Sequence, residues 1–221
     1  MSAGFDRLAR WYRWMELLSA GETLQRCRTE YLDEVRSARR VLVVGEGNGR
    51  FLCELVRANP GASVLCLDES GEMLRRARQR LHRNGLSETG VRFVQEDVRR
   101  WEPSGKDVDL VVTHFFLDCF PIDQLESVVG RISKTVGDGA QWLLADFQAP
   151  ASGWRRVRAR LFLRIMYTFF RLATRLPATD LVDPDPVLQD HGFRLCSRRV
   201  SEWGLLRSDL WQRKGVEAPA K

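Results

Sequence analysis

Apolar and polar residues follow two alternating periods along the middle of the chain. Short apolar runs are typical of buried strands, and they occur at 40–44, 63–67, 91–95, 108–113 and 140–146. Between these runs, apolar residues recur every three to four positions, which predicts helices over 49–58, 71–83 and about 122–136. Because strands and helices alternate, we expect a parallel sheet with helices on both faces.

Residues that cap or break helices agree with these limits. Ser70 stands at the expected N-cap of the helix over 71–83, and Asn84-Gly85 closes that helix. Asp123 is the expected N-cap of the helix that follows the fourth strand.

Both ends of the chain depart from this alternation. Apolar residues spaced by three and four predict one helix over 4–19, which Gly21 ends, and a second over 22–37. Near the other end, strand-like runs at 193–202 and 205–212 are joined by a short turn, which forces antiparallel pairing. The predicted fold is α/β: a doubly wound, mostly parallel seven-stranded sheet with a closing antiparallel strand and a helical N-terminal cap.

A glycine-rich loop follows the first strand. Gly45, Gly47 and Gly49 lead directly into a helix, so backbone N–H groups and a helix N-terminus come close to a ligand. We expect side chains at the three positions to block that approach. Asp68 ends the second strand, where a carboxylate is placed to hold two ribose hydroxyls. Loop and acid together predict a site for a nucleoside-bearing cofactor.

The glycine spacing separates the cofactor classes. A dinucleotide fold has G-x-G-x-x-G, whereas this chain has G-x-G-x-G with Arg50 in place of the third small residue. This spacing and the closing hairpin disfavour an NAD-type oxidoreductase. The chain has no G-x-x-x-x-G-K-[ST] loop, which argues against an ATPase. A tight turn without a ligand stays open as an alternative.

G-x-G-x-G with an acid about twenty residues further on resembles motif I and post-I of class I S-adenosylmethionine (SAM) methyltransferases. The resemblance covers residues 40–147 and points to the superfamily rather than to a substrate. One position departs from it: the family usually has an acid two residues before the first glycine, and this chain has Val43. The amino acid part of the cofactor must then be held by backbone groups and other residues.

The resemblance implies a set of cofactor-binding residues at the carboxyl ends of the strands. An acid after the third strand would bond the adenine amino group, and Asp97 fits best. The residues expected to contact SAM are Gly45, Glu46, Gly47, Gly49, Asp68, Glu69, Met73, Asp97, Val98 and Thr113. We expect a helical cap at 1–37, a SAM-binding methyltransferase domain at 38–214 with a helical insert at 154–176, and a polar tail at 215–221.

Methyl transfer needs a base only when the acceptor is a hydroxyl or an acidic carbon. His114 stands just past the fourth strand and is the candidate base, with Asp118 to orient it if the segment forms a helical turn. A second interpretation is that His114 only shapes the cofactor pocket with Thr113. Asp146, at the end of the fifth strand, is a further candidate base. No zinc-type spacing is present, and we predict no metal.

The spacing of arginines and apolar residues over 154–176 predicts one long helix, with the arginines in a single stripe. The stripe consists of Arg156, Arg160, Arg164, Arg171 and Arg175. The apolar arc beside it is wider than packing on a sheet requires. Four interpretations stay open: a core helix, a lid over a greasy acceptor, a helix that meets a partner, and a helix that lies on a membrane surface.

Charge and cysteine usage bound the partners. The net charge of +6 permits nucleic acid or anionic membranes, but Thr113-His-Phe-Phe116 replaces the motif with which base-flipping methyltransferases grip a base, so we do not expect nucleic acid. Five scattered cysteines without a C-x-x-C pair, and no signal peptide, indicate a reducing cytoplasm. No apolar run is as long as a membrane span.

We therefore predict a cytoplasmic SAM-dependent methyltransferase that acts on a small, lipophilic acceptor of quinone, phenol or lipid type. A looser resemblance to ubiquinone/menaquinone-type and phospholipid methyltransferases rests on the glycine loop, Gly71-Glu-Met-Leu74 and the hydrophobic cap. A non-catalytic SAM-binding or membrane-interaction protein stays open as the alternative. Peripheral contact with an anionic membrane and a homodimer also stay open.

Overall fold

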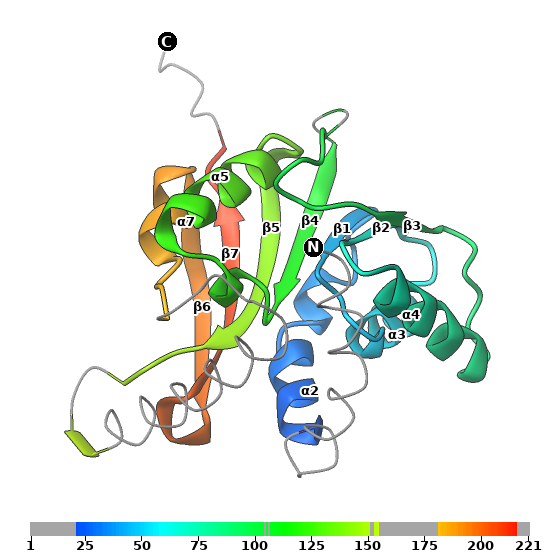
Figure 1. Cartoon of the computed structure of the whole chain (residues 1–221), viewed down its shortest axis with the longest axis horizontal. Helices are drawn as coiled ribbons and strands as arrows, with labels where there is room; N and C mark the ends of the chain where they lie inside the picture. Colours follow the sequence, from blue (N-terminus) through cyan, green and yellow to red (C-terminus); the bar gives the residue numbers. More distant parts are fainter. Residues whose placement is uncertain (1–20, 104, 106, 151–152, 155–180, 216–221) are drawn as a thin grey trace.

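The computed structural model of the chain describes residues 21–103, 105, 107–150, 153–154 and 181–215 (Figure 1). The strands in this part are β1 (Arg40–Val44), β2 (Ser63–Asp68), β3 (Val91–Gln95), β4 (Val108–His114), β5 (Val136–Phe147), β6 (Phe193–Ser201) and β7 (Leu206–Arg213). The α-helices are α2 (Gly21–Thr29), α3 (Arg50–Ala58), α4 (Gly71–Arg83), α5 (Ile122–Ser133) and α7 (Asp185–Asp190). The described residues also form three 3-10 turns: η2 (Asp33–Val35), η3 (Leu117–Cys119) and η4 (Glu202–Gly204).

The strands form one seven-stranded sheet in the order β3-β2-β1-β4-β5-β7-β6. β7 runs antiparallel to both of its neighbours, β5 and β6, and the pairs from β3 to β5 are parallel. The predicted doubly wound sheet and its closing hairpin are therefore confirmed. The order starts at β1 and winds outward in both directions, which places the carboxyl ends of β1 and β4 side by side.

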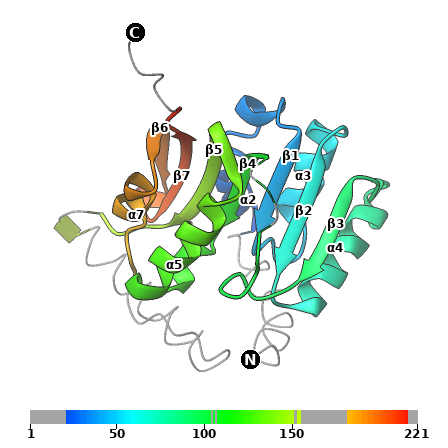
Figure 2. The same cartoon turned by 90° about the horizontal axis from the view of Figure 1, so that it is seen from above.

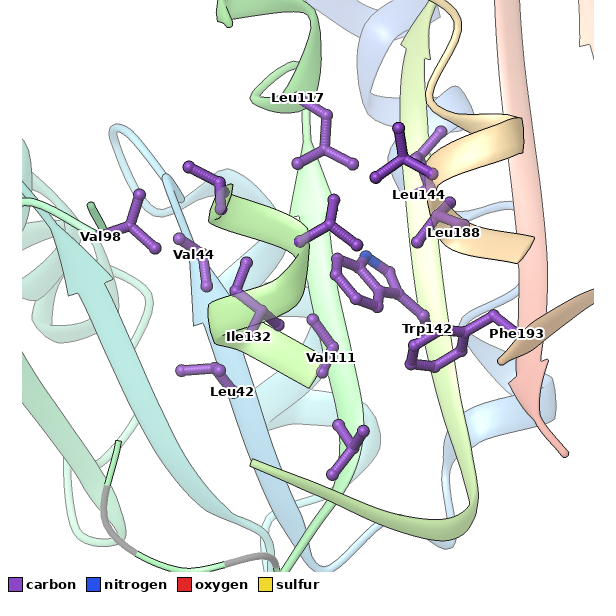
Figure 3. Close-up of a cluster of buried hydrophobic side chains, with 14 of the residues drawn as sticks. Leu42, Val44, Val98, Val111, Leu117, Ile132, Trp142, Leu144, Leu188 and Phe193 are labelled. Atoms are coloured by element: carbon purple, nitrogen blue, oxygen red, sulfur yellow. The ribbon is translucent and has the colours of Figure 1, made fainter. Parts of the chain in front are cut away.

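Each face of the sheet has its own hydrophobic core, because successive side chains of a strand point to opposite faces. Helices α5 and α7 lie on one face, and α3 and α4 lie on the other (Figure 2), where their apolar side chains pack against the sheet. On the α5 face, Trp142 meets Phe193 edge to face with ring centroids 5.2 Å apart (Figure 3). The Trp142 indole N–H donates to the Thr113 hydroxyl at 2.8 Å, whereas the indole nitrogen of Trp211 in the same core is buried without a hydrogen-bond partner.

Most element limits follow the prediction, and Ser70 caps α4 as expected, its hydroxyl accepting from the Met73 amide at 3.2 Å. Two predictions on α5 are wrong. Pro121, not Asp123, is the N-cap residue, and the helix ends at Ser133 because the chain turns there to start β5. Val136 already pairs with Val108 across a register shift, which the predicted start of this strand at 140 did not allow for.

The N-terminal prediction is wrong in its limits. The helix expected over 22–37 is split into α2 and η2, and Gly21, expected to end a helix, is the first residue of α2. The predicted helix over 4–19 and nearly all of the insert at 154–176 lie outside the described residues, as does the tail beyond 215. Within the described ranges, no helix is long and apolar enough to cross a membrane.

Candidate active site

The glycine loop lies between β1 and α3, and all three of its glycines have positive φ, +69° at Gly45, +69° at Gly47 and +83° at Gly49. A Cβ at Gly45 would lie 2.2 Å from the Phe116 ring, and one at Gly49 would lie 2.6 Å from the Cα of Ala77 on α4. A Cβ at Gly47 would meet nothing within 4 Å. Only Gly47 therefore faces open space, which corrects the expectation that all three glycines clear room for the ligand.

Asp68 joins this loop to the turn after β2. One carboxylate oxygen accepts from the Gly47 amide at 3.2 Å, and the other accepts from the Ser70 amide at 2.9 Å. The carboxylate thus lies beside the open position at Gly47, at the end of the second strand. This is the placement that ribose recognition requires.

Glu46 serves the structure of the loop itself. The N-cap residue of α3 is Gly49, which has no side chain to cap the helix, and the Glu46 carboxylate accepts instead from the Leu52 amide at 3.0 Å. Burial raises the pKa of Glu46 to about 7, although the Leu52 hydrogen bond and the nearby Arg28 oppose the rise. The Glu46 carboxylate therefore caps the N-terminus of α3.

The remaining predicted cofactor residues surround the turns after β2 and β3. Met73 is buried in the first turn of α4. The backbone carbonyl of Glu69 accepts from the Gln95 side chain at 3.3 Å. This hydrogen bond joins the turn after β2 to the end of β3, so Glu69 lies beside Asp68 at the same edge of the sheet.

Asp97 follows β3 and is paired with Arg99. The Arg99 guanidinium donates to both carboxylate oxygens, with its Nη2 2.7 Å from Oδ2 and its Nε 2.9 Å from Oδ1. Burial acts to raise the pKa of Asp97, but the hydrogen bonds from Arg99 outweigh it and hold the pKa below its ordinary value. The next residue, Val98, is buried in the α5-side core.

His114 and Thr113 end β4 and point to opposite faces of the sheet, so the structure does not bring them together. On the α5 side, the Thr113 hydroxyl accepts the hydrogen bond from Trp142. On the other side, His114 contacts Phe51 of α3 edge to face, with ring centroids 4.5 Å apart. Burial, together with Arg28, holds the pKa of His114 well below its ordinary value. The imidazole is therefore neutral at neutral pH, and its Nδ1 is buried without a hydrogen-bond partner.

Asp118 lies in η3, a 3-10 turn where the sequence predicted a helical turn, but it faces Asp146 of β5. Its backbone amide donates to the Asp146 carboxylate at 3.2 Å, and its own carboxylate accepts from the Cys119 thiol at 3.5 Å. Burial and the adjacent Asp118 raise the pKa of Asp146 well above its ordinary value, despite the opposing charge of Arg207. The two carboxyl groups form a buried pair, and Asp118 does not bond Nδ1 of His114.

A network of ion pairs lies on the closing strands beside this carboxyl pair, and Arg207, which is paired with Asp146 across β5 and β7, is part of it. Arg207 of β7, with a side chain 4% exposed, lies 2.9 Å from Asp185 of α7. Arg198 of β6 bridges Asp185 at 2.8 Å and Asp209 at 2.7 Å. These contacts leave no local signal in the sequence, because they join elements that are paired only after the hairpin has formed.

Arg28 is the other residue that the sequence did not reveal. It lies in α2, is 9% exposed, and its guanidinium is 5.0 Å from the centroid of the Phe115 ring. Figure 1 shows α2 next to the carboxyl end of β4. Among the described residues, no group of three or more His, Cys, Asp or Glu is placed to hold a metal ion.

Comparison with known proteins agrees with this geometry. A family model described as "Methyltransferase domain" matches residues 41–139. The demethylmenaquinone methyltransferase of Deinococcus radiodurans is 27% identical over 178 residues, which cover 75% of this chain and 72% of that protein.

Two solved structures share the fold. An O-methyltransferase family protein from Burkholderia thailandensis has a TM-score of 0.66 at 19% identity, over 89% of this chain and 59% of that one. Human N-acetylserotonin methyltransferase, solved in complex with SAM, has a TM-score of 0.61 at 18% identity, over 87% of this chain and 52% of that one. This chain thus spans little more than half the length of either protein.

The sheet order, the glycine loop with Asp68 and the family match define a class I SAM-dependent methyltransferase. The fold and the family match support membership of that superfamily, with SAM as the cofactor.

We expect Gly47→Val to abolish binding of S-adenosylhomocysteine, the product form of the cofactor, in a calorimetric titration. The reason is that the new side chain would occupy the open space beside Asp68. Gly139→Val is the matched control, because Gly139 also has positive φ and open space around its Cβ position but lies near the start of β5. A folded Gly47→Val protein that binds like the control would contradict the assignment of the loop.

Proposed function

We propose that the chain transfers the methyl group of SAM to a small lipophilic acceptor that loses a proton, such as a quinol or a phenol. The observation that carries the reaction is the open backbone at Gly47 beside the Asp68 carboxylate. When bound, SAM supplies an activated methyl group: a bond forms from its carbon to the acceptor, the S–CH₃ bond breaks, and a neutral thioether is left.

The Asp118–Asp146 pair is our proposed proton acceptor. It lies where β4 and β5 end, at the edge of the sheet at which the cofactor binds. Two close carboxyl groups in a buried site do not both ionise readily, so Asp146 keeps its proton to a higher pH than an ordinary carboxyl group does. Once it has lost that proton, its carboxylate can take one from the acceptor. A base whose pKa is raised above the ordinary carboxyl range suits this task. His114 stays the second candidate base.

Two names among the similar proteins support an acceptor of this chemistry. The Deinococcus protein is a demethylmenaquinone methyltransferase, and the Burkholderia protein is assigned to an O-methyltransferase family. Methylation of a quinol carbon or a phenol oxygen releases a proton, unlike methylation of a thiolate. The wide apolar arc that the sequence predicts for the segment 154–176 supports a lipophilic acceptor.

We expect short-chain naphthoquinols or phenols to be methylated, as measured by mass spectrometry, and amines not to be. Asp146→Asn should lower kcat about 10²- to 10⁴-fold while S-adenosylhomocysteine still binds. For the wild type, kcat should rise with pH and level off above the ordinary carboxyl range, because the pair must lose a proton first.

The same assay separates the alternatives. If His114→Gln loses activity and Asp146→Asn keeps it, His114 is the base and the carboxyl pair is not. If the wild type binds S-adenosylhomocysteine but methylates none of the acceptors, the non-catalytic alternative is favoured. Tight binding of NAD in place of S-adenosylhomocysteine would favour an oxidoreductase.

A second proposal is peripheral contact with an anionic membrane through the segment that begins at Trp154. The observation that favours it is a pair of indoles, Trp154 and Trp203, which are 60% and 57% exposed with ring centroids 5.9 Å apart. Indole rings favour the interface between water and lipid. The arginines of the following segment would add about 1 kcal/mol each near an anionic surface.

We expect the protein to sediment with vesicles that contain anionic lipid, and this binding to fall as salt is added. Changing Arg156, Arg160 and Arg164 to glutamate should abolish the binding. The same charge change at Arg83, Arg92 and Arg100, which are exposed near the β3 edge, is the control and should reduce it less. Sedimentation that does not depend on salt or on the first three arginines would overturn the proposal.

A further inference from the structure

The amino acid end of the cofactor needs a partner that β1 does not provide. The family usually places an acid at the position of Val43, and in this chain Val43 is buried in the core formed with α3 and α4. It pairs with Cys66 and Val112 on the neighbouring strands. No charge at this position can therefore meet a charged group of the ligand.

Arg28 is a buried cation that has no hydrogen-bonded anion among the described residues. It is 9% exposed, and among the residues that the structure describes it makes no hydrogen bond and no ion pair. Its one ring contact is with Phe115. A buried charge is costly unless it is paired. None of the Arg28 nitrogens is among the side-chain atoms that are both fully buried and without a hydrogen-bond partner. The guanidinium nitrogens are therefore not fully enclosed by the protein.

Other hydrogen bonds hold Arg28 in this place. The Gln25 side chain donates to the carbonyl of Arg50 at 3.2 Å, which fixes α2 to the start of α3. The Ser208 hydroxyl donates to the carbonyl of Cys27 at 2.7 Å, which fixes the neighbouring residue to β7. Arg28 is therefore positioned by its helix and not by its own charge, as a preformed binding group would be.

The charges around Arg28 show that it lies next to the glycine loop. Its charge acts on both Glu46 and His114, which come from the loop and from the end of β4. Glu46 is hydrogen-bonded to the Leu52 amide, and burial raises its pKa to about 7, so at neutral pH it offsets the charge of Arg28 only in part. An anion that enters beside Gly47 would meet Arg28 as its unpaired counter-charge.

We propose that Arg28 binds the carboxylate of the methionyl part of SAM, and so gives the amino acid end of the cofactor a charged contact where β1 offers none. The inference rests on the proposed function. The ribose would lie at Asp68, the chain of the ligand would pass the open Gly47 position, and its carboxylate would reach α2. A planar guanidinium can donate two parallel hydrogen bonds to a carboxylate, and stacking on Phe115 leaves its edge free to do so.

Calorimetric titration of three ligands tests the proposal: S-adenosylhomocysteine, its analogue without the carboxylate, and 5′-methylthioadenosine. Arg28→Met should weaken binding of S-adenosylhomocysteine roughly ten- to hundredfold. It should leave the affinity for the other two ligands unchanged, because neither has the carboxylate. Arg28→Lys keeps the charge but not the two-pronged geometry, and should recover part of the loss. Arg26→Met, exposed on the same helix, is the matched control and should bind all three ligands like the wild type.

The outcomes separate this inference from the function on which it rests. An equal loss for all three ligands would overturn the proposal and show that Arg28 supports the loop structure. Unchanged binding of S-adenosylhomocysteine by Arg28→Met would overturn it as well. If Arg28→Met does not fold, the ligand-selective loss in Arg28→Lys decides. A wild-type protein that binds none of the three ligands would instead contradict the proposed function.

Discussion

The hydrogen bonds from the Gly47 and Ser70 amides to Asp68 are the contacts on which the candidate site depends. They fix the glycine loop after β1 to the turn after β2, and so hold an open stretch of backbone beside a carboxylate. The sheet order makes them possible, because β1 and β2 are parallel neighbours whose carboxyl ends lie at one edge. Each further group of the site is positioned relative to this junction.

The fold was largely predictable because the two hydrophobic periods are clean in the centre of the chain. The errors fall where tertiary contacts override a local pattern. Val136 looks like the last apolar residue of a helix, but it becomes a strand residue because Val108 is its partner. Likewise the amphipathic run at 22–37 breaks after Thr29, because α2 docks on β7 through Cys27.

The candidate site was predictable in part. Gly47 and Asp68 carry a local sequence signal, since spacing along the chain brings them to one sheet edge. That His114 and Thr113 point apart follows from strand alternation and could have been foreseen. The pairing of Asp118 with Asp146, and the charge network beyond it, arise from elements distant in sequence. Arg28 was missed for the same reason, because an arginine in an amphipathic helix is usually solvated.

One measurement tests the assignment of the cofactor site most directly: calorimetric titration of wild-type protein and of Asp68→Ala with S-adenosylhomocysteine and with NAD. The wild type is predicted to bind S-adenosylhomocysteine and not NAD. Asp68→Ala, which removes charged hydrogen bonds to two ribose hydroxyls, is predicted to weaken that binding by roughly 1–3 kcal/mol. Tight NAD binding without S-adenosylhomocysteine binding, or an affinity unchanged by Asp68→Ala, would contradict the account.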